Sequence, residues 1–105
     1  MLFRSAAYRR ALDLRPAYPQ ALCNLGSALQ ELGEISEAVS LYQQAIQCQN
    51  DYPEAHYNLA LIQCANGDRE ASIRSFRQAI LCRPAYPQAL LGLSQVLKQI
   101  GRAHV

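Results

Sequence analysis

The chain has 105 residues, of which 50% are hydrophobic, and its formal net charge at pH 7 is +2. This length suits one ordinary domain, and this apolar content is too high for a disordered segment. Ten Lys and Arg against eight Asp and Glu give no reason to expect nucleic acid or an anionic membrane as a partner. No apolar run approaches the roughly 20 residues of a membrane-spanning helix, and no secretory signal is evident, so we expect an intracellular, cytoplasmic protein.

Residues 2–14 are predicted to form the first helix, because Tyr8, Ala11 and Leu12 recur at helical spacing. Proline is tolerated in the first turn of a helix, so the next helix is predicted to begin at Pro19. Its apolar positions are Leu22, Leu25, Leu29 and Leu32. Gly33 can take the left-handed backbone that closes a helix, so the chain is expected to turn there. A further helix follows, with apolar residues Ala38, Leu41, Tyr42, Ala45 and Ile46.

The same pair of helices recurs 34 residues later, with Pro53 at its start and Gly67 at its turn. Residues 15–22 also recur unchanged as residues 83–90, and Pro87 is expected to begin a last helix that Gly101 closes. We name the helix after each proline helix A and the helix after each glycine helix B. The repeat predicts a single domain, residues 1–105, made of these parts: a leading helix B (1–18), two full repeats (19–52 and 53–86) and a trailing helix A (87–105).

Small residues recur at the same register and predict where the helices approach each other. Gly26, Ala60 and Ser94 share one position of helix A, and Ala11, Ala45 and Ala79 share one of helix B. Helices approach closely only where side chains are short, and larger neighbours such as Tyr42 and Phe76 then fill the grooves beside the contact. The pattern therefore predicts an all-α stack of antiparallel helical hairpins.

These residues carry a resemblance to the tetratricopeptide repeat (TPR) family. The spacing of Leu25, Gly26, Leu29, Gly33, Ala38, Tyr42 and Ala45, with proline at the unit boundary, is similar to that of the family over almost the whole chain. The resemblance implies a right-handed α-solenoid and a module that binds protein or peptide. The sequence departs from the family pattern at His56, where the family often has Trp, and at Gln63 and Asn50.

The resemblance also implies that the A helices line a concave inner face. The residues expected there as the peptide-binding site are Gln20, Asn24, Ser27, Glu54, Tyr57, Asn58, Leu61 and Gln95. Asn24 and Asn58 are equivalent, and each carboxamide can both donate to and accept from a peptide unit of an extended ligand. They resemble the asparagine row of O-linked N-acetylglucosamine transferases, although Gly92 interrupts the row. The alternative is that these asparagines cap turns or face water.

The family's other mode of binding, a basic clamp for a C-terminal carboxylate, is disfavoured. It needs Lys or Arg on the inner face of helix A, where this chain has Cys23, Asn24, Tyr57 and Asn58. Arg9, Arg10 and Arg15, with Arg74, Arg77 and Arg83, could form a modest basic patch on the B helices, but such runs are usually solvated faces.

No catalytic residue, metal site or cofactor is expected. Cys23, Cys48, Cys64 and Cys82 form no C-x-x-C pair, and we expect free thiols packed as small apolar groups. His56 lies at a packing position and His104 at the end of the chain, which favours structural or surface roles over catalysis. No phosphate-binding loop or hydrolase motif occurs, so the chain is not expected to be an enzyme by itself.

Two hypotheses remain open. The first is a protein-interaction module that holds an extended peptide or a partner helix in its concave groove. The second is a substrate-recruiting arm of a larger enzyme such as a glycosyltransferase. The last helix bears apolar residues with no following partner, so self-association through the helical ends is expected if the chain is complete. These residues are Leu90, Leu93, Val96, Leu97 and Ile100.

Overall fold

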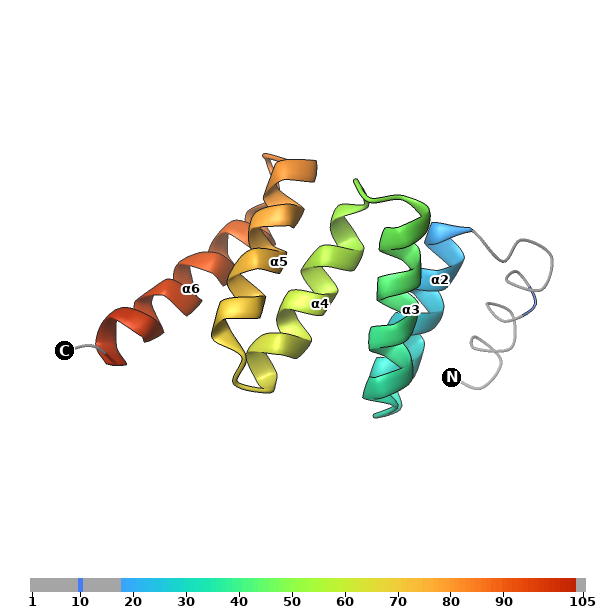
Figure 1. The fold of residues 1–105 in the computed structure, drawn as a ribbon, viewed down its shortest axis with the longest axis horizontal. Coiled ribbons are helices and arrows are strands. Elements are labelled where there is room, and N and C mark those ends of the chain that lie inside the picture. Colours follow the sequence, from blue (N-terminus) through green and yellow to red (C-terminus); the bar gives the residue numbers. More distant parts are fainter. Residues whose placement is uncertain (1–9, 11–17, 104–105) are drawn as a thin grey trace.

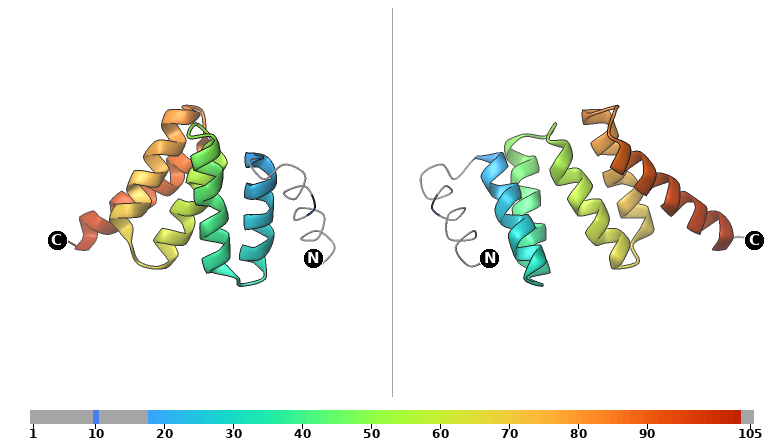
Figure 2. Two further views of the ribbon diagram at one scale, coloured as in Figure 1. Left: turned by 45° about the vertical axis from the view of Figure 1, so that its right-hand side comes forward. Right: turned by 180° about the vertical axis from the view of Figure 1, so that it is seen from behind.

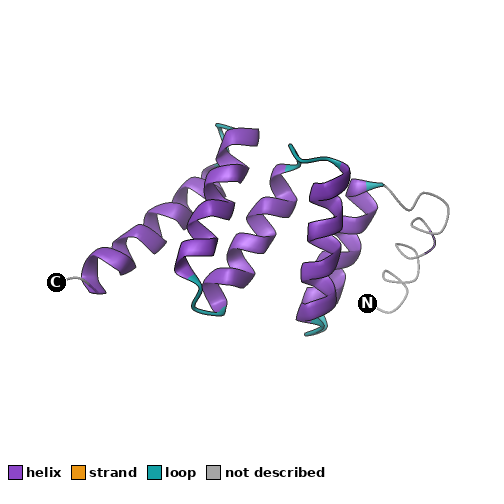
Figure 3. Cartoon of the chain, in the orientation of Figure 1, coloured by secondary structure: helices purple, strands orange, loops and turns teal. Residues whose placement is uncertain are grey.

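The computed structural model describes residue 10 and residues 18–103, and every regular element within them is an α-helix (Figures 1 and 3). The helices are α2 (Pro19–Glu31), α3 (Ile35–Cys48), α4 (Pro53–Ala65), α5 (Arg69–Cys82) and α6 (Pro87–Ala103). Helices α2 and α3 pack as one hairpin and α4 and α5 as a second, which confirms the expected all-α class. The predicted helix within residues 2–14 lies outside the described residues, apart from Arg10.

The three A helices, α2, α4 and α6, each begin at a proline: Pro19, Pro53 and Pro87. The preceding Tyr18 and Tyr52 are extended, with φ of −93° and −103°, which is the conformation that a residue before proline prefers. Each proline lacks an N–H that the first helical turn could not have used. The sequence therefore determines where these helices start.

Gly33 and Gly67 close the first two A helices in the left-handed conformation, with φ of +88° and +83°. The backbone N–H of Glu34 donates to Leu29 O at 2.8 Å, and that of Asp68 donates to Gln63 O at 2.9 Å. These bonds satisfy carbonyl groups that the end of a helix would otherwise leave unpaired. Both predicted turns are confirmed.

The predicted turn at Gly101 is wrong, because α6 continues through Gly101 to Ala103. Its φ is not positive, unlike those of the two turn glycines. Glycine permits the left-handed turn but does not impose it. At Gly33 and Gly67 a following helix packs back on the hairpin, whereas no helix follows α6 within the described residues.

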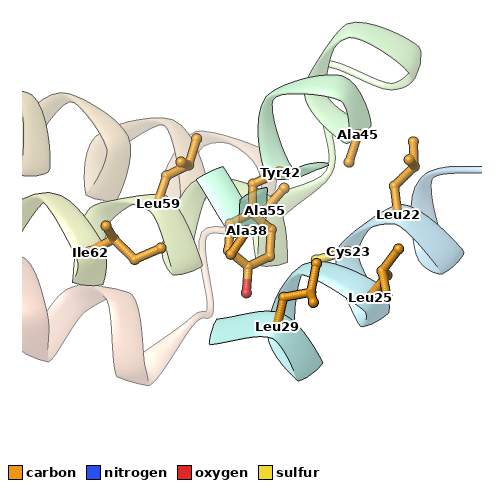
Figure 4. Close-up of a cluster of buried hydrophobic side chains, with 10 residues drawn as sticks. All are labelled: Leu22, Cys23, Leu25, Leu29, Ala38, Tyr42, Ala45, Ala55, Leu59 and Ile62. Atoms are coloured by element: carbon orange, nitrogen blue, oxygen red, sulfur yellow. The ribbon is translucent and has the colours of Figure 1, made fainter. Parts of the chain in front are cut away.

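Two apolar clusters form the core, one for each hairpin and its neighbouring helix. In the first, the ring of Tyr42 lies among side chains of α2, α3 and α4 (Figure 4). In the second, Phe76 occupies the equivalent position and packs with Ala60, Ala79, Tyr86, Ala89 and Val96. Each aromatic residue therefore joins its own hairpin to the next helix A.

The small residues lie where the aromatic residues need space. A Cβ atom added to Gly26 would lie 2.8 Å from Cε1 of Tyr42, and Ala60, Ala45 and Ala79 are fully buried. This confirms the predicted pairing of small with large side chains. Ser94, in the same register as Gly26 and Ala60, is exposed, because no helix B of its own repeat packs on α6 within the described residues.

The helices follow one another along an elongated body with extents of 51 × 27 × 19 Å, and α2 and α6 lie at its opposite ends (Figures 1 and 2). Helix α4 contacts both α2 and α6 directly, so the three A helices are neighbours. The A helices therefore present one continuous surface, on which the expected binding residues lie. None of the described helices is both long and apolar enough to cross a lipid bilayer.

Candidate peptide-binding surface

The residues expected to bind a peptide come from three adjacent helices. Gln20, Asn24 and Ser27 lie on α2, Gln95 lies on α6, and the α4 members are Glu54, Tyr57, Asn58 and Leu61. Gln20, Leu61 and Gln95 are exposed, whereas the other five are half-buried. The surface therefore combines accessible side chains with others that the neighbouring helices hold in place.

Asn58 forms a contact between adjacent A helices, because its Nδ2 donates to Sγ of Cys23 at 3.8 Å. Sulfur is a weak acceptor, and the contact engages one of the two amide hydrogens, so this carboxamide can still pair with a peptide unit. Cys23 is buried, and desolvation raises the pKa of its thiol to about 11, although the Asn58 hydrogen bond opposes the increase. Cys23 is therefore a protonated packing group beneath the surface.

Gly92 follows Asn24 and Asn58 in the same register, and the structure explains why the row stops there. A Cβ atom on Gly92 would lie 2.5 Å from Cζ of Phe76 and 2.6 Å from its Cε1. Any side chain at this position would have to displace a buried ring. The close approach of α6 to Phe76 therefore excludes a third asparagine.

Tyr57 contributes less free surface than its predicted role in binding suggests. Its ring centroid lies 6.0 Å from that of Phe76 and 5.2 Å from that of Tyr86, in tilted arrangements. Such pairs typically stabilise packing beyond the area they bury. Tyr57 thus links α4 to the second cluster while it lines the surface.

Glu54 is paired with Arg83, whose Nη2 donates to Oε2 at 2.7 Å. The guanidinium also lies over the Tyr86 ring, with 4.9 Å from Cζ to the centroid. Both charged side chains remain more than two-fifths exposed, so solvent screens the pair. The pair nevertheless offsets the one acidic residue of the expected site, which leaves this part of the surface close to neutral.

The sequence had not predicted a role for Tyr86 or for the Tyr42–Gln30 pair. Tyr42 Oη donates to Gln30 Oε1 at 2.8 Å, which fixes one inner-face amide from below. Tyr18, Tyr52 and Tyr86 recur every 34 residues, which was the available signal for a structural role of Tyr86. The partners of these tyrosines, however, depend on how the hairpins stack.

The remaining polar groups show no arrangement for chemistry within the described part of the chain. His56 is buried, and its Nε2 lies 2.8 Å from Asn50 O, which confirms a packing role. No group of three or more His, Cys, Asp or Glu side chains that could hold a metal ion occurs among the described residues. Arg74 and Arg77 are exposed on α5, while Arg9, Arg15 and His104 lie outside the described residues.

The four cysteines are free thiols, as expected, but they are not all packed as apolar groups. Cys23 is buried, and Cys64 and Cys82 are partly covered. Cys48 is exposed, which corrects the prediction for this residue. It is the last residue of α3, where the chain has already left the core.

Family models agree with this geometry. A model described as TPR repeat matches residues 5–33 and 29–67, and one described as tetratricopeptide repeat matches residues 55–84. The chain belongs to the tetratricopeptide repeat family. TPR domains generally serve as protein-interaction modules. A search of curated protein sequences gave no significant match.

Solved TPR structures superpose on most of the chain. MamA has a TM-score of 0.83 at 23% identity, over 92% of this chain and 57% of its own, so this chain spans little more than half of that protein. The first TPR of Spaghetti (RPAP3), bound to the HSP90 peptide SRMEEVD, has a TM-score of 0.84 at 18% identity, over 92% and 77%. These two likenesses concern the fold alone.

A third structure is more similar in sequence. The O-GlcNAc transferase of Thermobaculum terrenum, solved as a K341M mutant, has a TM-score of 0.81 at 32% identity. The match covers 89% of this chain but only 18% of that enzyme. This chain is therefore similar to a small part of a much larger protein.

Proposed function

We propose that this chain binds an extended segment of a partner protein along the surface of its A helices, and that Asn24 and Asn58 grip the backbone of that segment. The observation that carries the proposal is their equivalent placement on adjacent helices, half-buried beside the exposed Leu61. A carboxamide pairs with any peptide unit regardless of its side chain. Such a site selects an extended backbone first and a sequence second.

The spacing of the two asparagines fits this role. Packed helices lie about 8–10 Å apart, and an extended chain advances about 3.3 Å per residue. Adjacent asparagines would therefore meet peptide units about three residues apart. Side-chain preference would come from Leu61 on α4 and Gln95 on α6. Because so few residues are engaged, we expect a dissociation constant on the order of micromolar.

The charge of the site supports a neutral mode of binding. Glu54 is offset by Arg83, and positions 23, 24, 57 and 58 carry no cation. Charge therefore contributes little, and affinity should change little between low and physiological salt. The free thiols fit a reducing compartment, so we place the module inside the cell.

The test starts from a random-peptide phage library selected on the whole chain, followed by synthesis of the selected peptide. The double variant Asn24→Ala and Asn58→Ala should bind it about 10- to 100-fold more weakly, because two hydrogen bonds of about 1 kcal/mol each are lost. The matched control, Gln43→Ala and Gln78→Ala, removes exposed amides from α3 and α5 and should leave affinity unchanged. Unchanged capture by the asparagine variant, with helicity intact, would defeat the proposal.

The second candidate is that the chain is the recruiting arm of a larger enzyme such as a glycosyltransferase. The observation that favours it is the 32% identity to an O-GlcNAc transferase, of which the matched part is 18%. The coding sequence on both sides of this chain decides it. A flanking catalytic domain would support the idea, whereas stop codons on both sides and no such domain would defeat it.

A further inference from the structure

The outer face of α6 exposes positions that the other repeats bury. Leu22 and Leu29 of α2 are 2% and 4% exposed, whereas Leu90 and Leu97, at the same repeat positions of α6, are 47% and 44% exposed. Helix α3 covers the α2 pair, and no equivalent helix follows α6 in the described chain. Leu93, Val96 and Ile100 pack instead against the second cluster, so the expectation that all five apolar residues would lack a partner is wrong.

The α6 face, as we call the surface of Leu90, Ser94 and Leu97, has the form of a seat for a helix B. In the first hairpin Tyr42 lies against Gly26, the small residue between Leu22 and Leu29. Ser94 is the equivalent small residue of α6, and it is exposed. The face therefore fits a helix that presents an aromatic residue with a small residue three positions later, as Tyr42 and Ala45 do.

The chain contains one segment of this pattern with no helix A before it. Tyr8, Ala11 and Leu12 match Tyr42, Ala45 and Ile46, each 34 residues earlier, and the TPR model matches from residue 5 onward. Arg4 stands where α3 has Ala38, so the fit at that end would be looser.

The segment cannot reach the α6 face of its own chain. Residues 15–18 separate it from α2, and four extended residues span about 14 Å at most. Helices α2 and α6 lie at opposite ends of a body 51 Å long (Figure 1). The occupant must therefore come from another molecule.

We propose that the α6 face binds residues 2–14 of a second copy of this chain, so that Tyr8 of one copy seats against Ser94 of the next. The two halves would complete a TPR hairpin between molecules. Because the two surfaces differ, the association is head-to-tail and open-ended. This surface is separate from the peptide-binding surface of the A helices, so either proposal can fail without the other.

The first test compares two leucine-to-glutamate variants by sedimentation of the full chain. For the unaltered chain, average mass should rise above 11.7 kDa with concentration, up to the order of 1 mM, because small interfaces bind weakly. Leu97→Glu should remove the rise. The control Leu81→Glu changes a side chain that is 72% exposed on α5 and should leave the rise intact. A strictly monomeric unaltered chain, or equal loss in both variants, would overturn the proposal.

The second test separates head-to-tail association from pairing of two α6 faces. Fluorescently labelled Leu97→Glu chain keeps residues 2–14 unaltered, so excess unlabelled chain should still bind it and increase its sedimentation rate. Adding Tyr8→Ala to the labelled chain should abolish the increase, with helicity checked by circular dichroism. A labelled Leu97→Glu chain that stays monomeric while the unaltered chain associates would overturn the head-to-tail arrangement.

Discussion

Replacing Gly92 by Ala tests how closely α6 lies against the second hairpin. The new methyl group would lie 2.5 Å from Cζ of Phe76, which is buried to 1% exposure. The interior around such a ring is close-packed, so the ring cannot swing away without strain elsewhere. Overpacking of this kind costs about 1–3 kcal/mol, while the better helix propensity of alanine returns about 1 kcal/mol. We therefore expect a net loss of about 1 kcal/mol.

Gly101 provides the matched control, because it lies in the same helix and an added Cβ would meet nothing within 4 Å. Gly101→Ala should stabilise the chain by up to about 1 kcal/mol through propensity alone. The difference between the two variants isolates the contact with Phe76 and should amount to about 1–3 kcal/mol.

The assay is urea denaturation followed by far-ultraviolet circular dichroism, with hydrogen exchange to locate the effect. Repeats contact only their neighbours, so Gly92→Ala should accelerate exchange in α6 before it affects α2 and α3. If both glycine variants stabilise the chain equally, Phe76 does not lie against Gly92, and the explanation for the missing third asparagine fails with it.

Two further predictions concern the first cluster. Tyr42→Phe removes the 2.8 Å bond from Tyr42 Oη to Gln30 and should lower the free energy of unfolding by about 0.5–1.5 kcal/mol in the same denaturation assay, and an unchanged value would show that the bond contributes nothing. The pKa of Cys23 is raised from 9.0 to about 11 in the folded chain, so the unfolded chain loses the thiol proton first and stability should fall as pH rises from about 9 to 11. Cys23→Ala should flatten that decrease in thermal melts, and an equally steep decrease in the variant would contradict this cause.

The sequence predicted the helix starts and the first two turns because each depends on local backbone chemistry. Proline fixes Pro19, Pro53 and Pro87 in the first turn, and glycine allows the positive φ of Gly33 and Gly67. The same reasoning failed at Gly101, because a turn also needs a helix that packs back on it. Local signals thus predict where a turn is allowed, and packing decides whether it forms.

The candidate surface was harder to predict than the fold, because contacts between repeats decide which side chains remain accessible. The repeat placed Glu54, Tyr57 and Asn58 on helix A, but not their contacts with Arg83, Tyr86 and Cys23. Similarly, the last helix appeared uniformly apolar in sequence, yet Val96 is buried and Leu97 exposed. Which residues are shared between neighbouring hairpins depends on the stacking geometry.

The account depends most on the claim that the A helices bind the peptide, and nuclear magnetic resonance tests it most directly. The isotopically labelled chain is titrated with the phage-selected peptide while its side-chain amide signals are followed. We predict that the signals of Asn24 and Asn58 move with saturation, while those of Gln43 and Gln78 on α3 and α5 stay in place. Shifts confined to α3, α5 or the α6 face, with both asparagine signals unmoved, would contradict the account.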